Sequence, residues 1–280
     1  MLPTRRLVSL RLGCKTCYLE FQLFFLKHNN SFLFKIKTLY LRIVSYFNLI
    51  PTRSIRFWKH LYKGLTFNVS KKEYWKDEAE EASRLSVIAL WLFETFVQIL
   101  ELLGIGELYE TVNDFLKYNS RPLTPNEIKL AKSVYGETID YQFIRLDERA
   151  HIGPRFYRFC YVSFNLVNSW GSMHPSIFIH ELMHVWQYQQ YGAIYMIRAL
   201  IAQHTHCGYD YGGIKALKAR RKKGEGLTDF NLEQQGDIIA DYFLLKSGYQ
   251  TQWGNANLED LVVYQSYINE LKGSSEIPQA

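Results

Sequence analysis

Cysteine is scarce in this sequence, and internal repeats are absent. Four cysteines among 280 residues are too few for a scaffold held together by disulfides, so we expect a largely reduced core. Cys14 and Cys17 have the spacing of a metal or redox pair, but no second pair accompanies them. With 48% hydrophobic and 16% aromatic residues, the chain is neither disordered nor fibrous. Its length fits one large domain or two of modest size.

Long hydrophobic runs are missing from the start of the chain. The longest apolar stretch there, residues 21–26, is too short for a secretory signal or a membrane span. A later run at residues 85–103 is mainly apolar, but Glu94, Gln98 and Glu101 place a polar stripe on one helical face. Two acids argue against a membrane-spanning segment. We expect a packed core helix, with membrane or partner association as the less favoured alternative, and no recognisable signal peptide or transmembrane helix.

Acidic residues are nearly absent from the first quarter of the chain. Residues 1–70 contain twelve basic side chains and one acid, Glu20, although the net charge of the whole chain is only +6. The remaining residues, 71–280, therefore carry a net charge of −5. This asymmetry indicates a partner-binding arm or a segment of separate origin. We expect a basic, partly helical N-terminal region at residues 1–118 and a second domain at residues 119–280.

The pattern of elements predicts an α+β fold that is mainly helical. Residues 1–50 show no sustained period, whereas residues 73–118 are typical of two helices separated near Gly104. Residues 118–122 have the composition of a linker. A helix is expected over residues 125–135, with Thr124 as its N-cap and Glu127 completing a capping box.

A small β-sheet is expected after that helix. Residues 140–146 alternate imperfectly between apolar and polar side chains, and residues 155–166 are rich in aromatic residues and valine. The second run could also form the edge of a cleft, where an extended peptide would add as a strand.

The segment HELMH carries the chemistry of this sequence. It lies in an expected helix that opens at Pro175 and closes at Gly192. His180 and His184 are four residues apart, so both imidazoles emerge on one face and can hold a single zinc ion. Glu181 misses the metal and can act as general base on a metal-bound water. The alternative is two ordinary histidines on an amphipathic helix.

A third zinc ligand is expected from a second helix, which begins after Asn231. The metzincin extension fails, because Gln187 and Gln190 stand where a glycine and a histidine are required. Glu233 and Asp237 share one face of the second helix, an arrangement that matches gluzincins: Glu233 would bind the metal and Asp237 would orient a histidine.

Other assignments at this site were left open by the sequence. Acids on a solvated helix face are the alternative to a metal site at Glu233 and Asp237. Competing ligands are three further histidines: His174, His204 and His206. Gly236 would let the two helices approach closely.

Two tyrosines lie between the expected metal-binding helices. Tyr209 and Tyr211 could each donate a hydrogen bond to a developing oxyanion, although packing or a turn is the commoner role. We take Tyr211 as the catalytic candidate.

Three blocks of the sequence, at residues 121–136, 178–189 and 233–248, together resemble a bacterial family. They are similar to zincin-like, Vgr-related proteins and to the metallopeptidase-like domain found in extracellular contractile injection system loci. The resemblance covers about residues 119–250 and implies a zincin-type fold and a secretion-system context. In that context the protein would be cytoplasmic in the producing cell and exported by a specialised apparatus. Asp237 departs from the family pattern, which has a glutamate there.

The sequence therefore predicts a zinc-dependent metallopeptidase that hydrolyses a peptide or protein substrate. The alternative is a non-catalytic, zinc-stabilised structural or cargo module that associates with secretion-system components. A third, less favoured hypothesis is a protease whose basic N-terminal segment binds nucleic acid through its phosphates.

Overall fold

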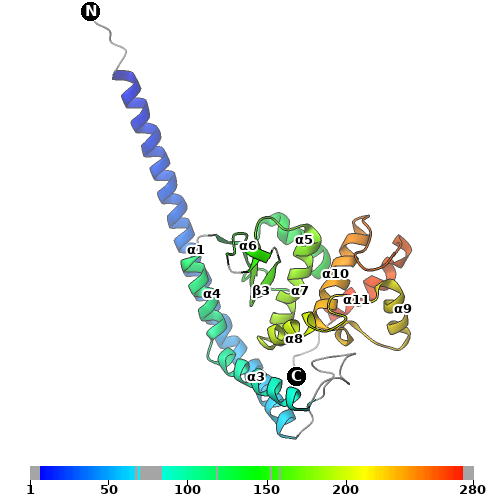
Figure 1. The fold of residues 1–280 in the computed structure, drawn as a ribbon. Helices are drawn as coiled ribbons and strands as arrows, with labels where there is room; N and C mark the ends of the chain where they lie inside the picture. Colours follow the sequence, from blue (N-terminus) through cyan, green and yellow to red (C-terminus); the bar gives the residue numbers. More distant parts are fainter. Residues whose placement is uncertain are drawn as a thin grey trace, which may run out of the picture. The chain divides into compact units, whose positions relative to one another are not determined.

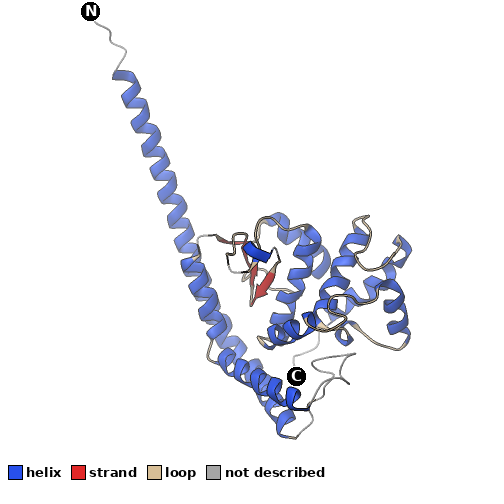
Figure 2. Ribbon diagram, viewed as in Figure 1, coloured by secondary structure: helices blue, strands red, loops and turns tan. Residues whose placement is uncertain are grey.

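The chain is mainly helical with one small mixed sheet, which confirms the expected α+β class (Figures 1 and 2). The computed structural model describes residues 7–66, 69, 84–117, 119–151, 153–157 and 159–273, with side chains from residue 32 onward. Its contacts form two compact units, Met1–Phe47 and Asn48–Ala280. A domain boundary at residue 118 stays a prediction.

Helix α1 spans Leu7–Leu65, although the sequence of residues 1–50 shows no sustained helical period. Glycine and proline are absent between Cys14 and Ile50, and nothing in that stretch interrupts a helix. The side chains of the Cys14–Cys17 motif and of residues 21–26 lie outside the described part of the chain.

Helices α3, Arg84–Leu102, and α4, Ile105–Leu116, meet at Gly104 as predicted. The polar stripe of α3 faces the protein, because Glu94, Gln98 and Glu101 are all buried while the apolar side chains opposite them are exposed. The expected core helix is therefore a surface helix with its apolar face outward. Among the described helices, α3 is the one long and apolar enough to cross a membrane, by length and composition.

Four three-residue strands form the sheet, in the order β1-β2-β4-β3. They are β1 (Ser120–Pro122), β2 (Arg145–Asp147), β3 (Tyr161–Ser163) and β4 (Leu166–Asn168). Strands β2 and β4 are parallel, and the other two pairs are antiparallel. The register places Leu146 and Val162 beside Val167, and β3 lies at one edge.

The sequence misplaced three parts of this sheet. Residues 120–122, expected in a linker, form β1. Of the strand expected over residues 140–146, only its end belongs to β2. The run at 155–166 divides into a short helix α6 (Pro154–Tyr157), then β3, a turn and the start of β4. The turn contains Phe164 at a φ of 60°, a conformation that alternation of side chains does not reveal.

Six further helices build the core that contains the HELMH segment. Helix α5 spans Pro125–Tyr135 and begins at the predicted capping box of Thr124 and Glu127. The others are α7 (Pro175–Tyr191), α8 (Ile194–Gln203), α9 (Gly213–Lys222), α10 (Leu232–Lys246) and α11 (Leu261–Gly273), with 3-10 turns η2 (Leu227–Asp229) and η3 (Leu258–Asp260). The start and end of α7 and the start of α10 agree with the predicted boundaries.

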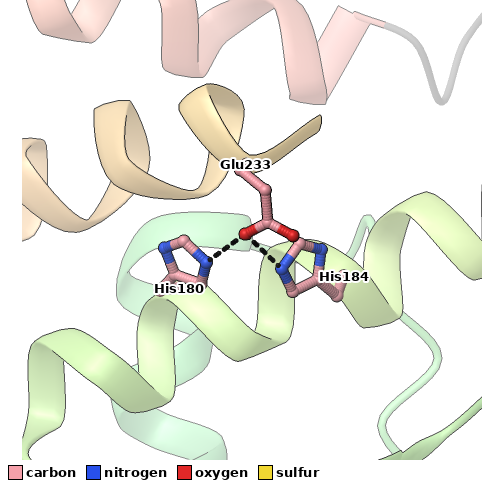
Figure 3. Close-up of side chains that lie close together, drawn as sticks. All are labelled: His180, His184 and Glu233. Atoms are coloured by element: carbon pink, nitrogen blue, oxygen red, sulfur yellow. Dashed lines mark hydrogen bonds and ion pairs between the residues drawn. The ribbon is translucent and has the colours of Figure 1, made fainter. Parts of the chain in front are cut away.

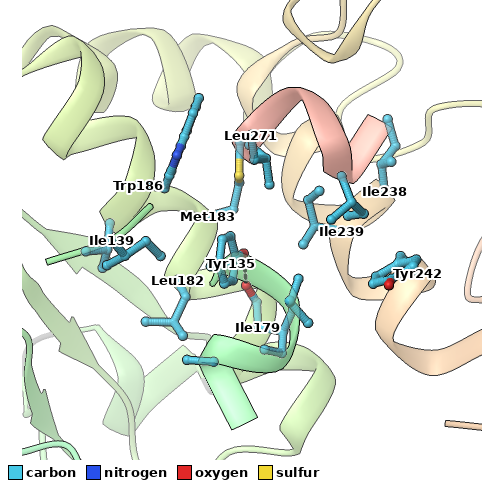
Figure 4. Packing of buried hydrophobic residues seen from close by; sticks show 14 of the residues in the cluster. Tyr135, Ile139, Ile179, Leu182, Met183, Trp186, Ile238, Ile239, Tyr242 and Leu271 are labelled. Atoms are coloured by element: carbon cyan, nitrogen blue, oxygen red, sulfur yellow. Dashed lines mark hydrogen bonds between the residues drawn. The ribbon is translucent and has the colours of Figure 1, made fainter. Parts of the chain in front are cut away.

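Helix α7 lies at the centre of this core and packs against α10, α8, α5 and the strands β3 and β4. Ile179, Leu182 and Met183 are fully buried and meet residues of α10 and α11 (Figure 4). The hydroxyl of Tyr135 in α5 donates to the carbonyl of Ile179 at 2.6 Å. The HELMH segment is thus held from several sides by apolar packing.

Candidate metal centre

Helix α7 is buried without interruption from Phe178 to Tyr188, although this stretch contains four polar side chains. They are His180, Glu181, His184 and Gln187. A buried polar group is costly unless a partner compensates for the lost water. The partners of these side chains therefore show what the helix is arranged to hold.

His180, His184 and Glu233 meet between α7 and α10, as their spacing predicts (Figure 3). The Nε2 atoms of His180 and His184 each lie 3.3 Å from Oε2 of Glu233. One donor atom from each of the three residues lies within 4.8 Å of the other two. All three side chains are buried.

These distances fit a metal ion better than hydrogen bonds between charged groups. Hydrogen bonds of that kind are about 2.7–2.9 Å long. Ligands held about 2.0–2.1 Å from a tetrahedral zinc ion stand about 3.3–3.4 Å from one another. Two imidazole nitrogens and one carboxylate oxygen are also a donor set that catalytic zinc sites use, with a fourth position left for water.

The outer nitrogen of each imidazole has its own acceptor. Nδ1 of His180 lies 2.7 Å from Oδ1 of Asp237, and Nδ1 of His184 lies 2.8 Å from Oε1 of Gln187. Both rings therefore donate outward from Nδ1 and turn Nε2 toward Glu233. Asp237 is itself held by the indole N–H of Trp253 at 2.5 Å, so its expected orienting position agrees with these contacts.

Gln187 was missed as a partner of the site. Its Nε2 donates to the carbonyl of Leu232 at 2.9 Å and to Oε1 of Gln235 at 3.0 Å. The amide of Gln235 donates in turn to the carbonyl of Phe230. These bonds fix the amide of Gln187 so that its oxygen faces His184. The sequence did contain a clue to this contact, because Gln187 follows His184 by about one helical turn.

Glu233 offers one oxygen to the histidines and the other to α8. Its Oε1 accepts from Nε2 of Gln203 at 2.9 Å, a contact that nothing in the sequence indicated. Burial opposes ionisation of Glu233, but the imidazoles of His184 and His180 hold its pKa well below the ordinary value. Burial likewise opposes charge on the imidazoles, yet the carboxylates of Asp237 and Glu233 raise the pKa of His180, and Glu233 raises that of His184. Glu233 is therefore held in its charged form by the two imidazoles.

Glu181 lies beside these ligands, and one of its carboxyl oxygens makes no hydrogen bond to the described residues. Burial raises the pKa of its carboxyl group, against the opposing charges of His180 and His184. Its Oε2 is buried and has no hydrogen-bond partner among the described residues. A buried carboxyl oxygen without a partner is free to bind a water or a substrate group.

The structure does not bring Tyr211 to these residues, so this candidate was misplaced. Its hydroxyl donates to Oδ2 of Asp241 at 2.5 Å and lies 2.7 Å from the hydroxyl of Tyr264. The side chain is 4% exposed, and burial raises its pKa. These contacts give Tyr211 a packing role in the core.

Tyr209, the other tyrosine between the two helices, lies beside His180. Its ring centroid lies 5.9 Å from that of His180, and the residue is 39% exposed. Burial, followed by the charges of Glu233 and Glu181, raises the pKa of Tyr209, so its hydroxyl remains a donor at neutral pH. It stands at the solvent side of the cluster.

The competing histidines do not join the cluster. His174 is the N-cap of α7 and accepts from the backbone of Ser176. Nδ1 of His204 contacts the carbonyl of Leu200 at 2.7 Å. Among the described residues, His180, His184 and Glu233 are the one group of metal-ligating side chains that meets in this way, and His206 is not part of it.

No family model matches the chain. The type VI secretion system spike protein VgrG2b of Pseudomonas aeruginosa is 32% identical over 142 residues, which cover 46% of this chain and 13% of that protein. The solved effector domain of P. aeruginosa VgrG2b overlaps 61% of this chain and 95% of its own length, at 21% identity and a TM-score of 0.30, a structural overlap too low to support an argument. About half of this chain is thus similar in sequence to a small part of a type VI secretion spike protein.

Proposed function

We propose that this chain is an effector or cargo module of a bacterial secretion system. The sequence similarity to VgrG2b supports this proposal. Because the chain spans only 13% of that spike protein, the proposal concerns a delivered module and not the spike itself. The module would be made in the cytoplasm and exported in association with components of the apparatus.

We further propose that the module is a zincin-like metallopeptidase with one zinc ion bound by His180, His184 and Glu233. The observation that carries this is the pair of 3.3 Å contacts to one carboxylate oxygen, with both Nδ1 atoms occupied on the outside. When bound, zinc would polarise a scissile carbonyl and lower the pKa of a water molecule. The similarity supports the secretion context more directly than it supports hydrolysis.

The residues around the centre suit peptide hydrolysis. Glu181 would accept a proton from the attacking water and pass it to the leaving amine, a task that suits a carboxyl group whose pKa burial has raised. Tyr209 would donate a hydrogen bond to the oxygen that becomes negative in the transition state. Strand β3 lies at the sheet edge and contacts α7, so an extended substrate would pair along it.

Metal analysis paired with a proteolysis screen tests this function. The purified protein should hold about one zinc, and His180→Ala and Glu233→Ala should each lose it. His204→Ala removes a histidine outside the cluster and should keep the metal. Unchanged metal content in the first two variants would refute the ligand assignment.

Glu181→Gln separates the catalytic proposal from a non-catalytic cargo module. The glutamine cannot accept the proton, so this variant should keep zinc and lose hydrolysis. If every biological readout survives the substitution, the module acts without catalysis. Tyr209→Phe should lower kcat more than it raises KM, whereas Tyr211→Phe should chiefly lower the free energy of unfolding, by about 1 kcal/mol.

A further inference from the structure

Helix α3 exposes an apolar face and buries its polar residues. Its exposed side chains are all apolar and share one side of the helix: Leu85, Ile88, Ala89, Leu92, Phe93, Phe96 and Ile99. Phe93 and Phe96 are 52% and 53% exposed, whereas Glu94 is fully buried. Surface helices of soluble proteins have the opposite arrangement.

The acids of α3 are buried because each has a cationic partner inside the protein. Glu94 accepts two hydrogen bonds from the guanidinium of Arg198 in α8, at 2.7 and 3.0 Å. Glu101 pairs with Arg56 at 2.7 Å and with Arg53 at 3.5 Å. These ion pairs fix the rotation of the helix, so its apolar face is held outward.

Helix α4 continues the arrangement. Glu110 accepts from the backbone and side chain of Asn165, and Asp114 pairs with Arg145, all on the buried side. The opposite side exposes apolar residues at four-residue intervals: Leu108, Val112 and Leu116. Two consecutive helices therefore have the same inverted polarity. We call the exposed apolar residues of α3 and α4 the outer face.

The composition of the outer face fits lipid better than protein. Protein–protein interfaces are about 56–65% apolar and have a polar rim. The exposed side chains of α3 include no polar one within the described part of the helix. The adjoining segment of α1 pairs with α3 through Arg56, and its exposed charged residues are Lys59 and Lys63, both cationic. Cations on a segment that packs against an apolar helix complement anionic lipid headgroups.

The ion pairs also decide between lying on a membrane and crossing it. Its length and mean hydropathy of 1.7 would allow Leu85–Leu102 to span a bilayer. Crossing would take Glu94 into hydrocarbon together with Arg198, a residue of a helix that packs against the metal-binding α7. If α3 instead lies on the membrane surface, the ion pair between Glu94 and Arg198 stays intact.

We propose that the outer face of α3 and α4 binds the surface of an anionic lipid membrane, with α3 lying in the interface. This surface is separate from the metal centre and does not depend on the proposed peptidase function. It would bring the module to a bilayer before or after it meets a substrate.

Co-sedimentation of the full chain with vesicles tests the proposal. The protein should bind vesicles of mixed phosphatidylcholine and phosphatidylglycerol more tightly than vesicles of phosphatidylcholine alone. The double variant Phe93→Gln/Phe96→Gln should weaken binding by roughly tenfold or more, since two half-exposed phenyl rings no longer enter the lipid. Lys59→Gln and Lys63→Gln should each reduce the preference for the anionic vesicles by about fivefold.

Matched controls make the result decisive. Leu258→Gln/Val262→Gln removes two apolar side chains elsewhere that are even more exposed than the two phenylalanines, and this variant should bind vesicles as the wild type does. Glu181→Gln should also bind normally, which separates this surface from the proposed chemistry. Wild-type protein that ignores both vesicles, or a Phe93→Gln/Phe96→Gln variant that binds as well as wild type, would overturn the proposal. A dimer that this double variant converts to monomer would instead assign the face to a second copy of the chain.

Discussion

Replacing Gly236 by alanine tests whether the contact between α7 and α10 holds the metal ligands in place. Gly236 lies in α10 directly against the imidazole of His180. A Cβ atom there would stand 2.5 Å from Cε1, 2.7 Å from Nδ1 and 2.8 Å from Nε2 of that ring. These atoms belong to the proposed ligand itself, so the added methyl group would act on the centre without changing any ligand.

The magnitude follows from two opposing effects. Alanine in place of glycine inside a helix stabilises it by about 1 kcal/mol. Overpacking a well-filled core costs about 1–3 kcal/mol, so the free energy of unfolding should fall by no more than about 2 kcal/mol. The imidazole must move by roughly 1 Å to restore an ordinary carbon contact of about 3.5 Å or more. That shift breaks the 2.7 Å contact with Asp237, and losing such an outer partner lowers metal affinity by about 10–100-fold.

Competition with a chelator measures the zinc affinity, and urea unfolding followed by circular dichroism measures the stability. Gly106→Ala is the matched control, since Gly106 is also helical but its Cβ would meet its nearest neighbours, Phe164 and Tyr188, at 3.3 Å. This control should leave zinc affinity unchanged. A Gly236→Ala protein that binds zinc within about twofold of the wild type would refute the reasoning.

Three further predictions concern polar contacts. Gln187→Leu should lower zinc affinity by about 10–100-fold, measured by the same competition, and a variant with unchanged affinity would exclude a part for this amide in orienting the histidine. Arg198→Met removes the guanidinium that pairs with the buried Glu94 carboxylate and should cost about 3 kcal/mol in urea unfolding. Glu94→Leu added to it should recover most of the loss, and additive losses would contradict the pairing. The side chain of Arg121 lowers the pKa of Glu127 below 4.5, so the stabilisation is complete above about pH 4.5 and disappears as the pH falls through the lower value. Acid unfolding of the Arg121→Gln variant should lack the pH-dependent loss of stability that comes from Glu127.

The helices that hold the candidate site, α7 and α10, could be predicted from the sequence. Pro175 and Gly192 bound α7, and Asn231 caps α10, because local side-chain chemistry decides where a helix begins and ends. The four-residue spacing within α7 also placed both histidines on one face. Glu233 was found because a zinc site needs a further ligand at a position that a second helix can reach.

The outer partners of the site residues, the tyrosine beside His180 and the strands could not be predicted, because they depend on tertiary contacts that local patterns do not encode. The partner of His184 and the second contact of Glu233 come from Gln187 and Gln203, and only tertiary packing brings those amides to the centre. Tyr209 and Tyr211 are two residues apart, and the loop conformation alone decides which of them faces His180. The strands are too short for alternation to locate them.

The amide chain from Gln187 to Gln235 has a consequence for how the centre could be regulated. It links the proton on His184 to the backbone carbonyls of Phe230 and Leu232, which lie where the chain enters α10. Glu233 is the next residue along that entry. A displacement of this short segment would therefore disturb a ligand and the orientation of another ligand in one movement. Because the first turn of α10 holds both Glu233 and the carbonyl of Leu232 that Gln187 contacts, we expect the three proposed ligands to gain or lose their positions together.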